Sequence, residues 1–220
     1  MLVFNGVIIL FLGGAFLTPL LLKMGYSLPA SLMYRTYSLT CHQLAYRSWF
    51  ILGQQPAYPR QAAQVPGLIP YGEATGFDEN DIFAAREFKG DERLGYKVAL
   101  CERDVAMYSG LLAFGLVFSL SGRRLPPASW LVWIGLGILP VAVDGLSQVV
   151  SQLPVAALHV ILPFRESTPF LRTLTGGLFG FTTGWFAYPL VEDSMAATKM
   201  WIERKYAPKP DRPLATGGQG

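Results

Sequence analysis

Four long apolar stretches constrain the fold of this sequence more than any other feature. They cover about residues 2–22, 105–120, 130–150 and 170–191. Asp144 and Arg172 are the charged residues inside them, and a helix of about 20 mostly apolar residues can cross the hydrocarbon core of a bilayer. Hydrophobic residues make up 51% of the chain and charged residues 15%, which is typical of a membrane protein. We therefore predict an all-α polytopic membrane protein, with a bundle of four transmembrane helices embedded in a lipid bilayer.

Basic residues in the short connections predict the orientation, because cytoplasmic loops are enriched in Lys and Arg. Arg123 and Arg124 lie in the turn after the second stretch, and further basic residues follow the fourth stretch. Two spans separate these regions, so both can be cytoplasmic. This topology predicts that both termini are cytoplasmic and that residues 23–104 are extracytoplasmic. We expect the membrane to be a bacterial plasma membrane. The first stretch lacks a basic n-region, which favours a retained anchor over a signal peptide.

The segment of about 29–52 is apolar but is interrupted by Arg35, His42 and Arg47. A central Arg costs about 2.5–3.5 kcal/mol to insert into a bilayer. An aromatic and small-residue stripe at helical spacing runs through the segment, formed by Tyr34, Tyr37, Cys41, Ala45 and Trp49. The pattern predicts one interfacial or re-entrant helix. If this helix spans the membrane instead, the N-terminus lies on the extracytoplasmic side.

The remaining segments are polar. Residues 54–97 form a long water-facing insertion, in which Asp78–Lys89 is predicted to be a short helix capped by Asp78 or Asn80. Residues 207–220 are rich in Pro and Gly, as expected of a flexible tail. Residues 1–206 are thus predicted to form a single membrane domain.

With this topology, polar residues from several segments meet at the outer membrane surface. The predicted cluster consists of Gln43, Arg47, Ser48, Arg103, Tyr108, Asp144, Gln148, Arg165 and Arg172, with His159 nearby. Asp144 is the most informative member, since an acid inside a span usually has a partner or a function. Arg172 is the expected partner at similar depth, with Arg103 and Arg165 as competitors. A structural ion pair is favoured over a proton relay.

The two cysteines, Cys41 and Cys101, allow three hypotheses: free apolar thiols, a disulfide, or metal ligands. An oxidising outer compartment favours a disulfide. A metal ion could instead bind Cys41, His42, Cys101 and Asp104, a mixed sulfur, nitrogen and oxygen set. Neighbouring residues point about 100° apart on a helix, so Cys41 and His42 could share an ion only where the helix is broken.

Three glycines at intervals of four residues, Gly176, Gly180 and Gly184, form a small-residue face in the fourth stretch. Such faces allow close helix packing. They predict a compact bundle or a dimer.

Several motifs resemble domain of unknown function 2085, a family of uncharacterised prokaryotic membrane proteins. The resemblance rests on Cys41-His42-Gln43 with Arg47-Ser48-Trp49-Phe50, on Cys101-x-Arg103 with Tyr108 and Gly110, on Pro140-x-x-x-Asp144-Gly145 with Gln148, and on Arg165-Glu166-Ser167 with Arg172 and Gly176. Members of that family typically carry a second cysteine where this chain has Asp104. The resemblance implies a membrane location and a recurring site, but a Cys-plus-Asp site in place of a Cys-x-x-Cys knuckle. It implies no activity.

Three functions remain open from the sequence. The first is a redox- or metal-linked membrane protein that uses the cysteine site. The second is an accessory or assembly subunit, with a membrane-protein partner or a second copy of the chain. The third is a small transporter or channel. No motif of a hydrolase or kinase is present, so an enzyme is not favoured and no cofactor other than a metal ion is indicated. The net charge of +3 includes no long basic run, which argues against a nucleic-acid partner.

Overall fold

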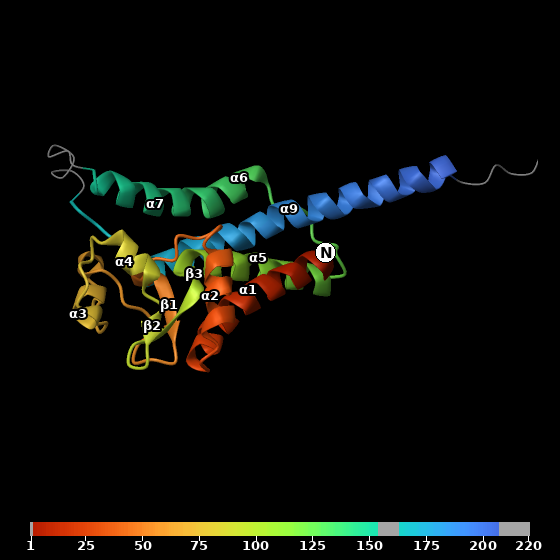
Figure 1. The fold of residues 1–220 in the computed structure, drawn as a ribbon. Helices are drawn as coiled ribbons and strands as arrows, with labels where there is room; N and C mark the ends of the chain where they lie inside the picture. The colour runs from red at the N-terminus through yellow and green to blue at the C-terminus, as the bar shows by residue number, and fades with distance from the viewer. Residues whose placement is uncertain (1, 154–162, 207–220) are drawn as a thin grey trace, which may run out of the picture.

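The computed structural model describes residues 2–153 and 163–206, in which long helices converge on a small sheet-containing region (Figure 1). The long helices are α1 (Leu2–Lys23), α5 (Glu102–Leu120), the run α6 (Trp130–Val132), η3 (Trp133–Ile138) and α7 (Leu139–Ser151), and α9 (Pro169–Tyr206). The η3 segment is a π-helical stretch. His159 and the predicted flexible tail 207–220 lie outside the described residues.

Three of the four predicted spans are long and apolar enough to cross a membrane, namely Val3–Lys23, Glu102–Leu120 and Trp130–Ser151. The fourth, 170–191, lies within α9 but is not among these spans. Arg172 and a high content of glycine and threonine lower the hydropathy of this part of α9. The fourth span therefore stays a prediction.

Close packing of α9 on α5 uses the predicted glycine face. A Cβ atom on Gly180 would overlap the carbonyl oxygen of Met107, and one on Gly184 would lie 3.1 Å from the Cβ atom of Phe114. A Cβ atom on Gly176 would press against the backbone of Arg103. The three glycines thus pack inside the chain, against a neighbouring helix of the same bundle.

The prediction of an all-α fold is wrong, because residues 48–101 contribute a three-stranded antiparallel sheet. Its strands are β1 (Ser48–Ile51), β2 (Gly90–Asp91) and β3 (Gly95–Cys101), in the order β1-β3-β2. Ser48 pairs with Cys101, and Phe50 pairs with Lys97. Every residue from Lys97 to Leu100 is fully buried, so the central strand is covered on both faces.

The predicted single helix over 29–52 is also wrong. Helix α2 spans only Ser27–Tyr37, and the chain then turns, passes through η1 (Ala45–Arg47) and enters β1. Gln43 lies in the turn with a positive φ of 53°. Its Nε2 atom donates to the carbonyl oxygens of Tyr34 and Ala99, both at 2.9 Å. Pairing with the distant strand β3 therefore replaces the local helical pattern.

The insertion 54–97 folds around an aromatic core that it shares with residues 44–50. It contains η2 (Gln61–Ala63), α3 (Tyr71–Thr75) and α4 (Ile82–Glu87). The aromatic core includes Tyr46, Phe50, Tyr58, Tyr71 and Phe88. The short helix predicted for 78–89 is α4, and its cap is Asp81, which accepts a hydrogen bond from the Ala84 N–H at 2.9 Å. Asp78 instead accepts from the Asn80 N–H.

Candidate functional site

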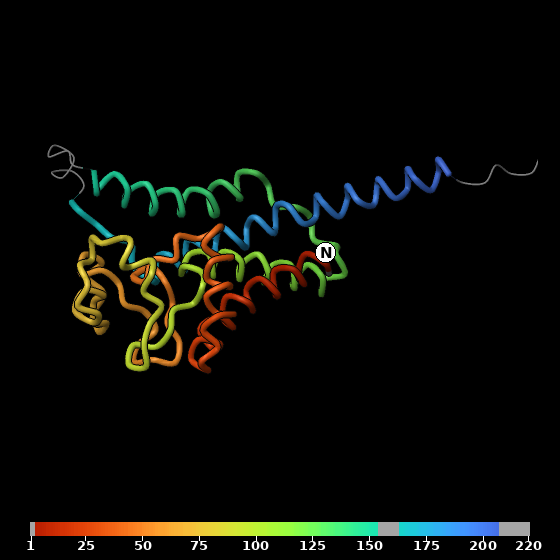
Figure 2. The backbone as a smooth tube through the Cα atoms, in the orientation of Figure 1, coloured from red at the N-terminus to blue at the C-terminus, as the bar shows by residue number. Residues whose placement is uncertain are grey.

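Helices α5 and α9 begin near the sheet, and α7 ends at the same end of the bundle (Figure 2). A cleft of about 430 Å³ lies there. Its walls include Cys41, His42, Gln43, Arg47, Cys101, Arg103, Asp104, Gln148 and Arg172. Residues that are distant in the sequence therefore share one solvent-accessible space.

Two thiols and a carboxylate form the first part of the site. Strand β3 ends at Cys101, α5 starts immediately after it, and Asp104 lies in the first helical turn. Cys41 approaches from the turn after α2, and its Sγ atom accepts a hydrogen bond from the Cys101 N–H at 3.2 Å. Ligand atoms of Cys41, Cys101 and Asp104 all lie within 4.8 Å of one another. Two chain segments thus present three metal-ligating side chains at one point.

Both cysteines are free thiols. The neighbouring Cys101 side chain and burial raise the pKa of the Cys41 thiol, because a Cys41 thiolate would lie desolvated beside the Cys101 sulfur and the Asp104 carboxylate. His42 is exposed and lines the same cleft, outside the three-ligand group. The chain is not helical between residues 41 and 44. The angle of about 100° between neighbouring helical side chains therefore does not apply here, and Cys41 and His42 can face one ion.

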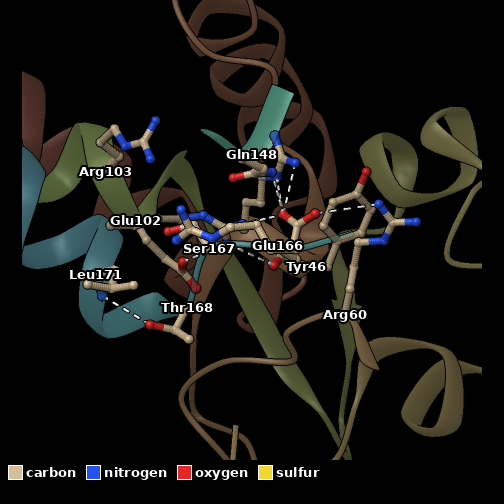
Figure 3. A network of polar contacts seen from close by, with 12 residues as sticks. Tyr46, Arg60, Glu102, Arg103, Gln148, Glu166, Ser167, Thr168 and Leu171 are labelled. Carbon is tan, nitrogen blue, oxygen red and sulfur yellow. Dashed lines mark hydrogen bonds and ion pairs between the residues drawn. The ribbon is translucent and has the colours of Figure 1, made fainter. Parts of the chain in front are cut away.

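Glu166 is the centre of the second part of the site, a network of arginines (Figure 3). Its fully buried carboxylate forms ion pairs with Arg47 Nη2 at 2.8 Å and with Arg60 Nη1 at 3.5 Å. It also forms an ion pair with Arg172. Gln148 Nε2 and Gln152 Nε2 donate to the same carboxylate at 2.8 and 3.1 Å. A single acid therefore ties η1, η2, α7 and α9 together.

Arg172 extends this network into the bundle. Its Nη1 atom lies 3.2 Å from Glu102 Oε2, at the start of α5, and donates to the Tyr46 carbonyl oxygen at 3.4 Å. The Arg60 guanidinium also lies over the Tyr46 ring, 5.3 Å from its centroid. Arg172 and Glu102 are both buried, so this ion pair belongs to the protein interior.

Asp144 has different partners from the predicted one. It binds Arg103 Nη2 at 2.5 Å and Arg165 Nη2 at 3.0 Å, and it accepts from the Ser167 hydroxyl at 2.8 Å. The predicted pair of Asp144 with Arg172 is wrong, and the two competitors are the partners. Arg172 is engaged by Glu102 and Glu166 instead.

Three predicted cluster residues have structural contacts. Gln43 joins α2 to β3, as described above. The Ser48 hydroxyl donates to the Leu44 carbonyl oxygen at 2.9 Å. Tyr108 packs its ring against Phe11, with a centroid distance of 4.9 Å, away from the cleft walls.

Sequence reasoning missed three buried charged residues: Glu102, Glu166 and Lys97. Glu166 could have been found, since it stands between Arg165 and Ser167 in a family motif. Lys97 donates from Nζ to the carbonyl oxygens of Gln43 at 2.7 Å and Arg86 at 2.5 Å. Burial lowers the pKa of Lys97 to about 7, and the two N–H bonds of a neutral amine match these two acceptors.

The apolar helices and the comparison with known protein families both indicate that the chain is a membrane protein. Residues 93–186 match the family described as "predicted membrane protein (DUF2085)". An uncharacterized protein of Methanocaldococcus jannaschii is 24% identical over 162 residues, which are 72% of this chain and 67% of the relative. No solved structure matches the chain at a significant level. The resemblance inferred from the motifs is thereby confirmed.

Proposed function

We propose that this membrane protein binds a thiophilic transition-metal ion, with Zn²⁺ as the reference case, through Cys41, Cys101 and Asp104. The proximity of these three ligand atoms, all within 4.8 Å of one another, carries the proposal. Zn²⁺ is held by Cys sulfur at about 2.3 Å and by carboxylate oxygen at about 2.0–2.2 Å. Small side-chain movements would bring the three atoms to these distances.

The charge balance around the site supports the proposal. Two thiolates and one carboxylate around a divalent cation carry one net negative charge. Arg47, Arg103 and Arg172 line the same cleft and would compensate that charge. Three protein ligands would leave one coordination position for His42, water or a substrate, as in catalytic zinc sites.

Loading the site requires loss of the thiol protons. Metal binding to thiolates competes with protonation, and the pKa of Cys41 is raised. The affinity for Zn²⁺ should therefore increase as the pH rises from 6 to 8, by about tenfold per pH unit for each proton displaced.

A second candidate function uses the same pair of thiols as a reversible disulfide. The observation that favours it is the short distance between the two Sγ atoms, which lie within the 4.8 Å group. Forming the S–S bond releases two protons and transfers two electrons to an oxidant such as a quinone. An oxidising compartment outside the membrane, as the predicted topology requires, would favour this state.

Purified protein distinguishes these two functions. The metal site predicts one Zn²⁺ per chain by elemental analysis, two reactive thiols after denaturation in chelator, and loss of the metal in Cys41→Ser and Asp104→Ala. His42→Ala is the matched control, because loss of the His42 imidazole should weaken Zn²⁺ binding less than Cys41→Ser or Asp104→Ala does. A disulfide predicts no stoichiometric metal and no reactive thiol until reductant is added. Two free thiols without metal affinity would contradict both.

The two other functions considered from the sequence have less support. The glycine face that favoured an oligomer packs against α5 of the same chain. Asp144, the residue that favoured a transport path, is held by Arg103 and Arg165. Neither feature therefore supplies an argument for an assembly partner or for transport.

A further inference from the structure

A second cleft adjoins the one that contains the thiols. It has a volume of about 470 Å³ and shares Arg47, Arg103 and Gln148 with the first cleft. Its other walls come mainly from α7 and include Val141, Leu146 and Val149. Leu146 and Val149 are exposed and belong to a helix that can span a membrane. The second cleft thus joins the shared arginines to a lipid-facing surface.

The arginine network is richer in positive than in negative charge. In the described part of the chain, five guanidinium groups contact four carboxylates. The guanidinium groups belong to Arg47, Arg60, Arg103, Arg165 and Arg172, and the carboxylates to Glu79, Glu102, Asp144 and Glu166. Desolvated charge that lacks a counterion is costly, so a bound anion would stabilise this end of the bundle.

Arg47 and Arg103 are the arginines that line both clefts. Their side chains are 31% and 28% exposed, whereas that of Arg172, which lines the first cleft, is 3% exposed. The Nε atom of Arg103 is buried and has no hydrogen-bond partner among the described residues. A ligand oxygen in the shared part of the two clefts could accept from it.

From these observations we infer that the two clefts bind an anionic phospholipid from the membrane. Its phosphate group would lie between Arg47 and Arg103, with Gln148 as a further donor, and an acyl chain would follow Val141, Leu146 and Val149 on α7. Arginine recognises phosphate through paired, charge-assisted hydrogen bonds, and basic pockets between transmembrane helices bind lipid headgroups. The apolar wall distinguishes a lipid from free phosphate. The inference uses Arg47 and Arg103, which also line the cleft of the proposed metal site, but it does not require a bound metal.

The test is a titration of the full-length protein in neutral detergent with fluorescent phosphatidylglycerol. Arg103→Gln should weaken binding by about tenfold, because a charge-assisted hydrogen bond is lost. Arg123→Gln is the matched control, since Arg123 pairs with Glu192 at the other end of the bundle, and its affinity should stay within about twofold of the unmodified protein.

A second pair of variants tests the acyl-chain cleft without changing charge. A Cβ atom on Gly145 would meet only Arg103 Nη1, at 3.6 Å, so Gly145→Leu fills the cleft without a backbone clash. It should lower the affinity by about fivefold or more, as expected when an apolar chain loses its contact surface. Gly13→Leu is the control, because Gly13 is exposed on α1 with open space around it.

Three outcomes would overturn the inference. In the first, phosphatidylcholine binds as tightly as phosphatidylglycerol, so the arginines do not select an anion. In the second, inorganic phosphate competes at concentrations similar to those of the lipid, so the ligand is a soluble anion. In the third, Gly145→Leu and Gly13→Leu bind equally well while melting like the unmodified protein.

Discussion

Asp144 and Glu166 both accept hydrogen bonds from several arginines, yet their surroundings differ. Glu166 is completely buried, and its partners Arg172 and Arg60 are 3% and 11% exposed, while Arg47, its third partner, is 31% exposed on the cleft side. Asp144 is paired with Arg103 and Arg165, which are 28% and 31% exposed. Burial removes water as an alternative partner, so breaking a buried pair leaves an uncompensated charge. The difference assigns a structural role to the Glu166 centre and leaves the arginine side of the Asp144 centre accessible to ligands.

The largest effect is expected from Glu166→Gln. This change leaves Arg172 and Arg47 without their shared carboxylate, and we expect a loss of about 3–5 kcal/mol in the free energy of unfolding. Denaturant unfolding of the detergent-solubilised protein measures it. Glu87→Gln, the same change at an exposed position of α4, should be nearly neutral. Equal stability of the two variants would contradict the structural role of Glu166.

The second prediction concerns Lys97, a buried amine whose protonation should affect stability because no carboxylate among the described residues pairs with it. It forms no ion pair with the described residues, and its pKa is lowered to about 7 in the folded protein. The unfolded chain therefore binds more protons than the folded one between pH 7 and about 10.5. Stability should rise with pH over this range, by an amount on the order of 3 kcal/mol, and should be lost again as the pH falls to 7.

Lys97→Met should abolish this pH dependence, since the side chain then has no proton to release. Unfolding midpoints at pH 7 and pH 9.5 measure it for both proteins. Lys89→Met supplies a comparison at a nearby, less buried lysine whose charge also lowers the pKa of Lys97, and it should reduce the rise without abolishing it. A rise that persists in Lys97→Met would assign the pH dependence to another group.

A smaller effect is expected from Asp144→Asn. The amide can keep the hydrogen bond from Ser167, and the two arginines are exposed enough to be hydrated. We therefore expect a loss of about 1–2 kcal/mol, well below that of Glu166→Gln. Unfolding under the same conditions allows direct comparison. A loss as large as that of Glu166→Gln would remove the distinction between the two centres.

The smallest effect is expected at the opposite end of the bundle. Arg123 and Glu192 form an ion pair at 2.9 Å, with side chains 42% and 28% exposed. Exposed pairs contribute little, so Arg123→Gln should change stability by less than about 1 kcal/mol. A larger loss in the same unfolding measurement would show that exposure alone does not rank these ion pairs.

The sequence predicted the helices that depend on local composition and failed where distant segments pair. The spans 105–120 and 130–150 begin and end within a few residues of α5 and of the α6-to-α7 run, because an apolar run of that length has few alternatives. Residues 48–51 have no such local signal. Their strand depends on pairing with Gly95–Cys101, which helical spacing cannot reveal.

The site was predicted in composition and only partly in its pairing. The sequence predicts a metal set of Cys41, His42, Cys101 and Asp104, and the structure brings all of these except His42 into one group. Asp144 was expected to pair with Arg172 because both occupy the same depth. Depth does not give the direction of a side chain around a helix, and Arg172 faces Glu102 and Glu166 instead.

The central position of Arg172 has a consequence for biogenesis. Glu102 is synthesised 70 residues before Arg172, and Arg47 is synthesised 119 residues before Glu166. During translation, the emerging chain must hold these early charges without their final partners. Correct seating of Glu166 and of the first turn of α9 is therefore the step that pairs these charges, and a chain that stops before residue 166 would leave them without these partners.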